Sequence, residues 1–157
     1  MSAREPLGAG LAGDELTLAG PLHPSPQELN PLVLAFIGDA VFDLHIRLAL
    51  VAGGHPQARG LHEAAVAYVR AGAQAGALRR LDGELTDTEQ GIVRRARNAR
   101  PGHMPRNADP AEYHQATAFE ALVGYLFLTG QTDRLKELLR RSALGSADQT
   151  DRQPSDA

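Results

Sequence analysis

The segment Leu32–Phe42 reads LVLAFIGDAVF and is the most apolar stretch of the chain. Asn30 and Pro31 stand before it as a helix cap and a first helical residue, which predicts a helix over about 31–52. Apolar residues at spacings of three and four form its expected core stripe: Leu34, Ile37, Val41, Leu44, Leu48 and Val51. The opposite side carries Leu32, Phe36, Phe42, Ile46 and Leu50. A helix that is apolar nearly all round is expected to be covered on both sides, by its own domain or by a partner subunit.

The rest of the chain shows the same helical periodicity. Further helices are expected over about 57–81, 86–99, 109–128 and 132–144. Thr86 and Glu89 fit a capping box at the start of one of them. No stretch alternates between apolar and polar residues for long enough to predict a strand. The sequence therefore predicts an all-α protein of about five to six helices.

The expected helices lie in one body. The chain has 157 residues, which is enough for one domain with a substantial core. That domain is expected over residues 29–144. Residues 1–28 are rich in glycine and proline, and residues 145–157 are polar without periodicity. Both ends are expected to be disordered, as an N-terminal arm and a C-terminal tail.

Composition excludes several classes of function. The chain has no cysteine, which excludes disulfides, thiolate catalysis and cysteine-ligated metal sites. The net charge is −3, so no overall basic field indicates nucleic acid. No apolar run reaches the roughly 18 residues that a membrane helix needs, and the start of the chain lacks the pattern of a signal peptide. A cytoplasmic protein without a membrane partner is expected.

Two carboxylates stand where apolar residues would be expected. Asp39 interrupts the first segment, and Glu120 interrupts Ala118–Leu128, which reads AFEALVGYLFL. A lone buried carboxylate costs several kcal/mol unless it is paired, hydrogen-bonded or bound to a cation. Gly38 and Gly124 lie near the two acids, and a glycine inside a helix indicates close backbone packing or room for a ligand.

Two explanations of these acids remain open from the residues alone. Asp39 can pair with a buried arginine or reach water at a helix edge. Alternatively, carboxylates from two facing helices can hold Mg²⁺, which prefers oxygen ligands and retained waters. Asp43 lies one turn after Asp39, and a divalent cation would relieve the repulsion between them. Asp43 is interpreted as a rim residue, with a water-mediated role as the alternative.

Basic residues gather in one part of the chain. Five arginines fall between Gly91 and Asn107 with no acid among them: Arg94, Arg95, Arg97, Arg100 and Arg106. Fifteen of the 16 basic residues are arginine, which binds phosphate oxygens as a planar fork. The dipole of a helix favours arginine near its C-terminus, but this cluster continues into a loop rich in proline and glycine. Contact with a phosphate backbone is therefore expected.

Taken together, these residues resemble the ribonuclease III family. The string IGDAV at 37–41 is similar to the core of that family's first motif, and TAFEALVGYL at 117–126 is similar to its second acidic motif. RARNA at 95–99 and PRN at 105–107 resemble elements of the family's compact branch, the Mini-ribonuclease III proteins. The resemblance covers about 30–144.

The resemblance implies a ribonuclease III-type helical domain that acts as an endonuclease on double-stranded RNA and leaves 5′-phosphate and 3′-hydroxyl ends. It implies dependence on Mg²⁺, with Mn²⁺ as a substitute, and assigns catalysis and metal binding to Asp39 and Glu120. The residues it implies for RNA binding are Arg94, Arg95, Arg97, Asn98, Arg100, Arg106 and Asn107. Ala35 and Thr117 stand where full-length family members carry further acids.

The resemblance also implies partners. The protein is expected to be a homodimer that matures the precursor of the large-subunit (23S) ribosomal RNA, and a ribosomal protein is a candidate partner. One alternative is a catalytically silent RNA-binding or ribosome-assembly module on the same fold. Another is a helical adaptor without an RNA partner, which would leave the arginine cluster and both acids unexplained.

Overall fold

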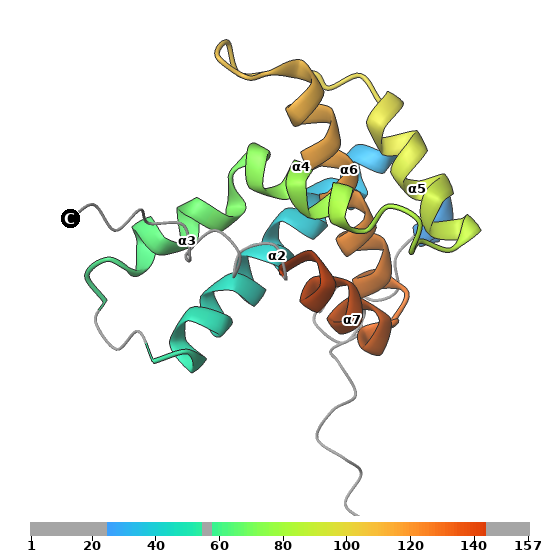
Figure 1. Cartoon of the computed structure of the whole chain (residues 1–157). Coiled ribbons are helices and arrows are strands. Elements are labelled where there is room, and N and C mark those ends of the chain that lie inside the picture. Colours follow the sequence, from blue (N-terminus) through green and yellow to red (C-terminus); the bar gives the residue numbers. More distant parts are fainter. Residues whose placement is uncertain (1–24, 55–57, 144–157) are drawn as a thin grey trace, which may run out of the picture.

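In the computed structural model, residues 25–54 and 58–143 are described, and they form helices joined by loops (Figure 1). The elements are the short 3-10 helix η1 (Pro26–Glu28) and the α-helices α2 (Pro31–Ala52), α3 (Leu61–Val69), α4 (Ala71–Arg80), α5 (Asp87–Asn98), α6 (Pro110–Leu128) and α7 (Thr132–Ala143). These residues contain no strand, which confirms the all-α prediction. None of the described helices combines the length and apolar character needed to cross a membrane.

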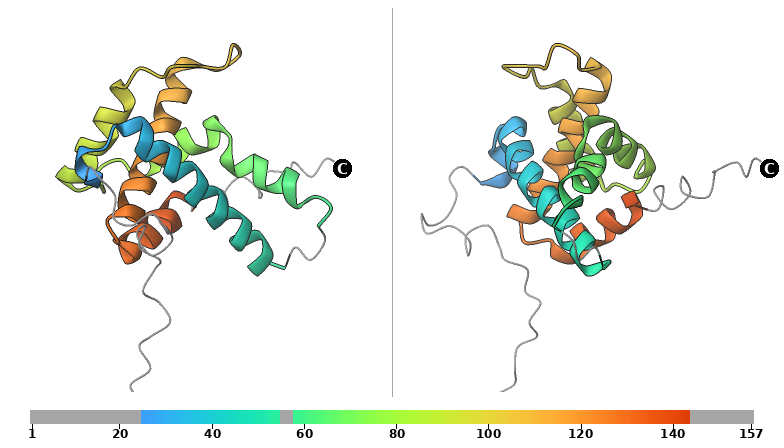
Figure 2. Two further views of the ribbon diagram at one scale, coloured as in Figure 1. Left: turned by 180° about the vertical axis from the view of Figure 1, so that it is seen from behind. Right: turned by 90° about the vertical axis from the view of Figure 1, so that its left-hand side faces the viewer.

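Helix α6 forms the centre of the molecule. It packs against α2, α4, α5 and α7, and Figures 1 and 2 show these helices arranged around it. Side chains all round α6 are buried, among them Phe119, Leu122 and Leu126. Each fully buried leucine or phenylalanine contributes roughly 1.5–3 kcal/mol. The carboxylate on α6 is therefore held by the most completely packed helix of the protein.

Helices α2 and α6 cross at a pair of glycines. A Cβ atom on Gly38 would collide with the backbone carbonyl oxygen of Glu120 and lie 2.8 Å from the backbone nitrogen of Gly124. A Cβ on Gly124 would collide with the carbonyl oxygen of Leu34. The two backbones therefore touch directly, and close packing explains both glycines. Because Asp39 follows Gly38, this crossing also brings the two helical carboxylates to the same place.

Most expected helix ends are confirmed. Asn30 caps α2 through a bond from the Leu32 backbone N–H (2.9 Å), and Pro31 is the first helical residue. The capping box of Thr86 and Glu89 is present at α5. Glu89 is almost fully buried and also accepts hydrogen bonds from Arg134, which joins α5 to α7.

The single helix predicted over 57–81 is wrong. The structure has two helices there, α3 and α4, separated at Arg70, whose backbone is extended (φ −69°, ψ 155°). Neither glycine nor proline marks this break. It follows from packing, because α3 lies against α2 whereas α4 lies against α6.

The core stripe predicted for α2 is also partly wrong. The buried residues are Leu34, Ala35, Gly38, Phe42 and Ile46. Leu44, Leu48 and Val51 were expected in the core but are more than half exposed. Both stripes are equally apolar, so periodicity alone could not distinguish the face that meets α6 from the face left open.

The two predicted ends of the chain lie largely outside the described residues. The last residues of the predicted arm, however, form η1. Gln27 in this turn contacts Tyr125 through its side chain (3.4 Å), and its carbonyl oxygen accepts a bond from Arg95 (3.1 Å).

Replacing either crossing glycine should destabilise the protein. Gly38→Ala and Gly124→Ala each force two backbones apart, and we expect a loss of about 1–3 kcal/mol in the free energy of unfolding despite the higher helix propensity of alanine. Gly91→Ala on α5 is the matched control, because its Cβ would meet nothing within 4 Å, and it should gain up to about 1 kcal/mol. Urea denaturation measures all three. Wild-type stability in both crossing variants would contradict the packing argument.

Candidate functional site

Asp39 and Glu120 come together in one pocket, although 80 residues of chain separate them. Asp39 projects from α2, directly after Gly38, and Glu120 projects from α6, one turn before Gly124. The pocket measures about 300 Å³. It is lined by Leu32, Ala35, Phe36, Asp39, Pro101, Gly102, His103, Tyr113, Thr117 and Glu120. The pairing of the two sequence-predicted acids is therefore present in the fold.

The two acids differ in burial. Asp39 is exposed, so it is not buried in its apolar helix but reaches water, which is one of the explanations that the sequence left open. The face of α2 that contacts α6 contains Leu34, Gly38 and Phe42, and Asp39 lies at the edge of this face. Glu120 is partly covered, as expected for an acid on the central helix. The pair thus combines one solvated and one sheltered carboxylate.

Glu120 holds its proton unusually tightly. Burial raises its pKa, and the negative charge of Asp39, which lies within hydrogen-bonding reach, raises it further, to about 8. The nearby side-chain amide of Gln74 acts in the opposite direction and lowers the pKa of Glu120. At neutral pH the Glu120 carboxyl group therefore keeps its proton, and a cation placed between the two acids would take the place of that proton.

Gln74 is a part of the site that sequence reasoning did not identify. It lies on α4, is 1% exposed, and its amide is close enough to Glu120 to lower the pKa of that acid. Its Nε2 atom nevertheless has no well-formed hydrogen bond. An unsatisfied buried amide costs about 1–3 kcal/mol. The only signal in the sequence is a lone polar residue within Ala71–Leu78, which reads AGAQAGAL.

Asp43 lies on the other side of Asp39. It forms an ion pair with Arg47, one turn further along α2, at 2.9 Å. Both residues line a second pocket of about 420 Å³, which Asp39 also borders together with His62. Asp43 does not line the pocket shared by Asp39 and Glu120, in agreement with its interpretation as a rim residue.

The donor set fits a hard divalent cation. In the described residues no group of three or more histidine, aspartate or glutamate side chains is placed to hold a metal. Two adjacent carboxylates are nevertheless enough protein ligands for a Mg²⁺ site. This ion keeps several of its waters and is often held by only one or two carboxylates. Ala35 and Thr117 line the same pocket without adding a charge.

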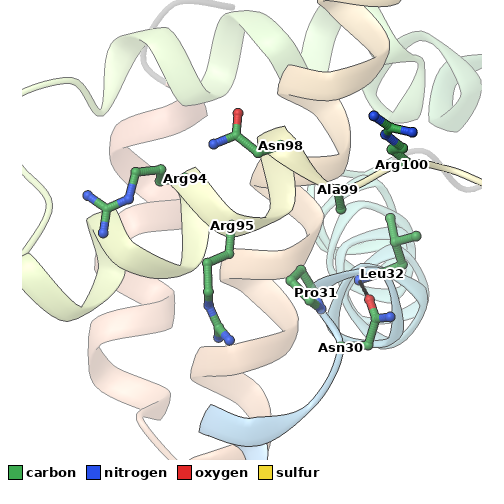
Figure 3. A pocket seen from close by; sticks show the side chains of 8 residues that line it. All are labelled: Asn30, Pro31, Leu32, Arg94, Arg95, Asn98, Ala99 and Arg100. Atoms are coloured by element: carbon green, nitrogen blue, oxygen red, sulfur yellow. Dashed lines mark hydrogen bonds between the residues drawn. The ribbon is translucent and has the colours of Figure 1, made fainter.

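Four of the seven predicted RNA-binding residues border a single pocket. This pocket of about 480 Å³ lies between the start of α2 and the end of α5, and its polar lining includes Asn30, Arg94, Arg95, Asn98 and Arg100. Figure 3 shows that the three arginine side chains diverge from one another instead of converging on a point. The arrangement is a broad basic surface and suits an extended anion better than a single small one.

The basic surface adjoins the carboxylates. Leu32 lines both pockets, and the chain that leaves α5 passes from Arg100 into Pro101 and Gly102, which border the acidic pocket. Arg97 is exposed on α5 but lines neither pocket. Arg106 and Asn107 are exposed in the loop before α6, which projects from the body in Figure 1. The structure does not bring these three residues to either pocket.

Comparison with known proteins shows which family the chain is similar to. A family profile for the ribonuclease III domain matches residues 32–131. A protein from Symbiobacterium thermophilum named Mini-ribonuclease 3 is 48% identical over 119 residues, which is 76% of this chain and 92% of that protein. One of the same name from Brevibacillus brevis is 45% identical over 74% of this chain and 87% of its own length. A crystal structure of a Fusobacterium nucleatum protein superposes with a TM-score of 0.66 at 29% identity, covering 72% of this chain and 92% of that one.

The raised pKa of Glu120 predicts a pH dependence of stability. In the unfolded chain Glu120 ionises above about pH 4.5, whereas in the metal-free folded protein it keeps its proton until about pH 8. Unfolding then releases a proton, so stability should fall as the pH rises through this window. Glu120→Gln removes the effect, and we expect its stability relative to the wild type to rise by an amount on the order of a few kcal/mol between pH 5 and 8.

Denaturant titrations in EDTA at a series of pH values measure this difference. The comparison with Glu120→Gln cancels the contributions of all other titrating groups. Parallel pH profiles for the two proteins would show that Glu120 ionises normally in the fold.

Proposed function

The chain belongs to the ribonuclease III family of endoribonucleases that act on double-stranded RNA, and on that premise we propose that Asp39 and Glu120 form its cleavage site. The observation that carries the proposal is the meeting of these two acids in one pocket beside a basic surface. A catalytically silent module would have no use for two carboxylates whose closeness raises the pKa of Glu120. The interpretation as an enzyme is also favoured by the name that its relatives share.

Asp39 and Glu120 are proposed to hold Mg²⁺, with Mn²⁺ as a substitute. Their carboxylate oxygens suit a hard cation, and the cation would relieve the repulsion between them. When bound, such an ion lowers the pKa of a coordinated water and neutralises charge on phosphate oxygens. Cleavage consists of addition of water to phosphorus and breakage of the bond to the 3′ oxygen, which takes up a proton. The products carry 5′-phosphate and 3′-hydroxyl ends.

The role of the basic surface is to hold the RNA backbone beside these acids. Double-stranded RNA is recognised mainly through its shape, phosphates and 2′-hydroxyls. The diverging guanidinium groups of Arg94, Arg95 and Arg100 suit successive phosphates along a strand, and the Asn98 amide can donate to a 2′-hydroxyl. Arg97, Arg106 and Asn107 would extend the contact outward from the two pockets.

The natural substrate is proposed to be a precursor of the large-subunit (23S) ribosomal RNA. The support is the resemblance of the motifs to the compact branch of the family. Purified protein should then cut the duplex at the ends of the precursor in preference to an unrelated duplex of equal length. Equal cutting of both would remove the support for a dedicated ribosomal substrate, and restoration of the preference by an added ribosomal protein would identify that partner.

A homodimer is proposed through the open face of α2. Val33, Leu44, Leu48 and Val51 recur along this face with 44–63% of their surface exposed. The C-terminal part of α2 and the neighbouring α3 project from the body in Figure 2, and α3 adds exposed Val66 and Tyr68. A continuous apolar surface of this kind is typical of an association site. The second copy would cover the side of α2 that its own domain leaves open.

Removing the Asp39 carboxylate should abolish cleavage without abolishing RNA binding. Asp39→Asn keeps the size of the side chain but removes its charge, so we expect a loss of more than about 100-fold in the rate of duplex RNA cleavage, since removal of even a group that orients a metal ligand costs 10–100-fold. Cleavage by the wild type should require Mg²⁺ and stop in EDTA. Asp82→Asn, at an exposed position after α4, is the matched control and should cleave normally. Wild-type activity in Asp39→Asn would disprove the assignment.

Neutralising the basic surface should weaken binding in a salt-dependent way. In Arg94→Gln/Arg95→Gln we expect lower affinity for duplex RNA. The slope of log affinity against log salt should decrease by about 1 for each phosphate that the variant no longer neutralises. Arg140→Gln, an exposed arginine on α7, should leave the slope unchanged. Filter binding at several salt concentrations measures both variants, and an unchanged slope in the double variant would place the RNA elsewhere.

Placing charge on the open face of α2 should separate the subunits. Leu44→Glu/Leu48→Glu puts two carboxylates into the proposed interface, and it is expected to sediment as a monomer where the wild type sediments as a dimer. Gln90→Glu adds an exposed charge on α5 and should not alter the mass. Sedimentation equilibrium decides the point. A monomeric wild type, or a dimeric double variant, would contradict this interface.

A further inference from the structure

We propose that Gln74 is a positioning residue whose Nε2 group holds the Glu120 carboxylate toward Asp39 when the site binds a divalent cation. This inference rests on the proposed function, because it assigns a role within the same site. Gln74 touches neither RNA nor the cation in this proposal and acts only through Glu120.

The environment of Gln74 gives the amide no structural purpose. The residue is 1% exposed on α4, in the layer that packs against α6. Its neighbours in the helix are small or apolar, including the buried Ala75, Ala77 and Leu78. Methionine or leucine would fill the same volume without a polar group. A buried hydrogen-bond donor among such residues lowers the stability of the fold. Buried donors of this kind are expected where they serve a functional site.

Nε2 of Gln74 is also the one buried side-chain polar atom without a hydrogen-bond partner among the residues that the structure describes. The carboxyl group of Glu120 lies close enough to the amide for the two to interact. A carboxylate with full negative charge is a stronger acceptor than a protonated one. Nε2 therefore has a hydrogen atom free to donate to the Glu120 carboxylate when that carboxylate binds a cation.

The chemistry of metal sites gives this arrangement a function. A carboxylate that binds a metal is commonly oriented by a hydrogen bond from a second residue, which fixes its direction and lowers the cost of binding. Asp39 is exposed and reaches the pocket from α2, whereas Glu120 is the partly covered acid that needs orientation from behind. Helix α4, which carries Gln74, contacts α6 and contributes no residue to the basic surface described above.

The test is metal binding by the full chain without RNA. Mn²⁺ is titrated and followed by electron paramagnetic resonance, and thermal melting is measured in EDTA. Gln74→Met is expected to bind Mn²⁺ about 10-fold more weakly than the wild type, within the range for removal of a group that orients a metal ligand. It is expected to melt at an equal or higher temperature, because the unsatisfied amide is gone. Gln90→Met on exposed α5 is the matched control and should bind Mn²⁺ as the wild type does.

Weaker Mn²⁺ binding without a lower melting temperature distinguishes a positioning role of Gln74 from a structural one. If Gln74 only supports the fold, Gln74→Met lowers the melting temperature and leaves Mn²⁺ affinity unchanged, which would overturn the inference. Gln74→Leu is the second variant, and unfolding of both would equally assign the amide to stability. Duplex RNA cleavage by Gln74→Met should recover at high Mg²⁺, whereas Asp39→Asn should not.

Failure of the proposed function gives a different result. A wild type that neither binds Mn²⁺ nor cleaves duplex RNA would overturn the metal site itself and this inference with it. A wild type that does both, beside a Gln74→Met variant with the same Mn²⁺ affinity, would overturn only the role of Gln74.

Discussion

The direct contact between the backbones of α2 and α6 is the constraint on which the other features depend. Gly38 and Gly124 allow it, because any side chain at either position would collide with the opposite helix. The same contact determines where the proposed cleavage acids lie, since Asp39 follows Gly38 in sequence and the carbonyl oxygen of Glu120 is the atom that Gly38 faces. A wider crossing would separate the acids. Packing and the proposed function therefore both require glycine at these two positions.

The proximity of Asp39 and Glu120 is electrostatically unfavourable. Burial of Glu120, together with the negative charge of Asp39 beside it, raises the pKa of Glu120 to about 8. An arrangement chosen for stability alone would replace one acid, as it would replace the unsatisfied Gln74. The surrounding core is apolar and well packed, so the protein tolerates this local cost. The cost is concentrated where a cation and a phosphate backbone are proposed to bind.

Particular residues show where sequence reasoning failed. Asp39 was expected to be buried because its neighbours are apolar, but one apolar face of α2, with Leu44, Leu48 and Val51, is not covered by its own domain. The break at Arg70 has no local signal, since it arises where the chain changes from packing on α2 to packing on α6. Gln74 was missed because a single glutamine in an alanine-rich helix has no pattern. Its proposed role depends on Glu120, which lies 46 positions away in the sequence.

The sequence by itself determined the all-α class, the caps of α2 and α5, and the two acidic motifs with their glycines. These are local properties, because caps, periodicity and glycine within a helix act over one or two turns. Only the tertiary structure decided which face of α2 is buried, which arginines border a pocket, and that Gln74 lies beside Glu120. Such relations join segments far apart in the chain, and they follow from how the helices pack around α6 rather than from any single helix.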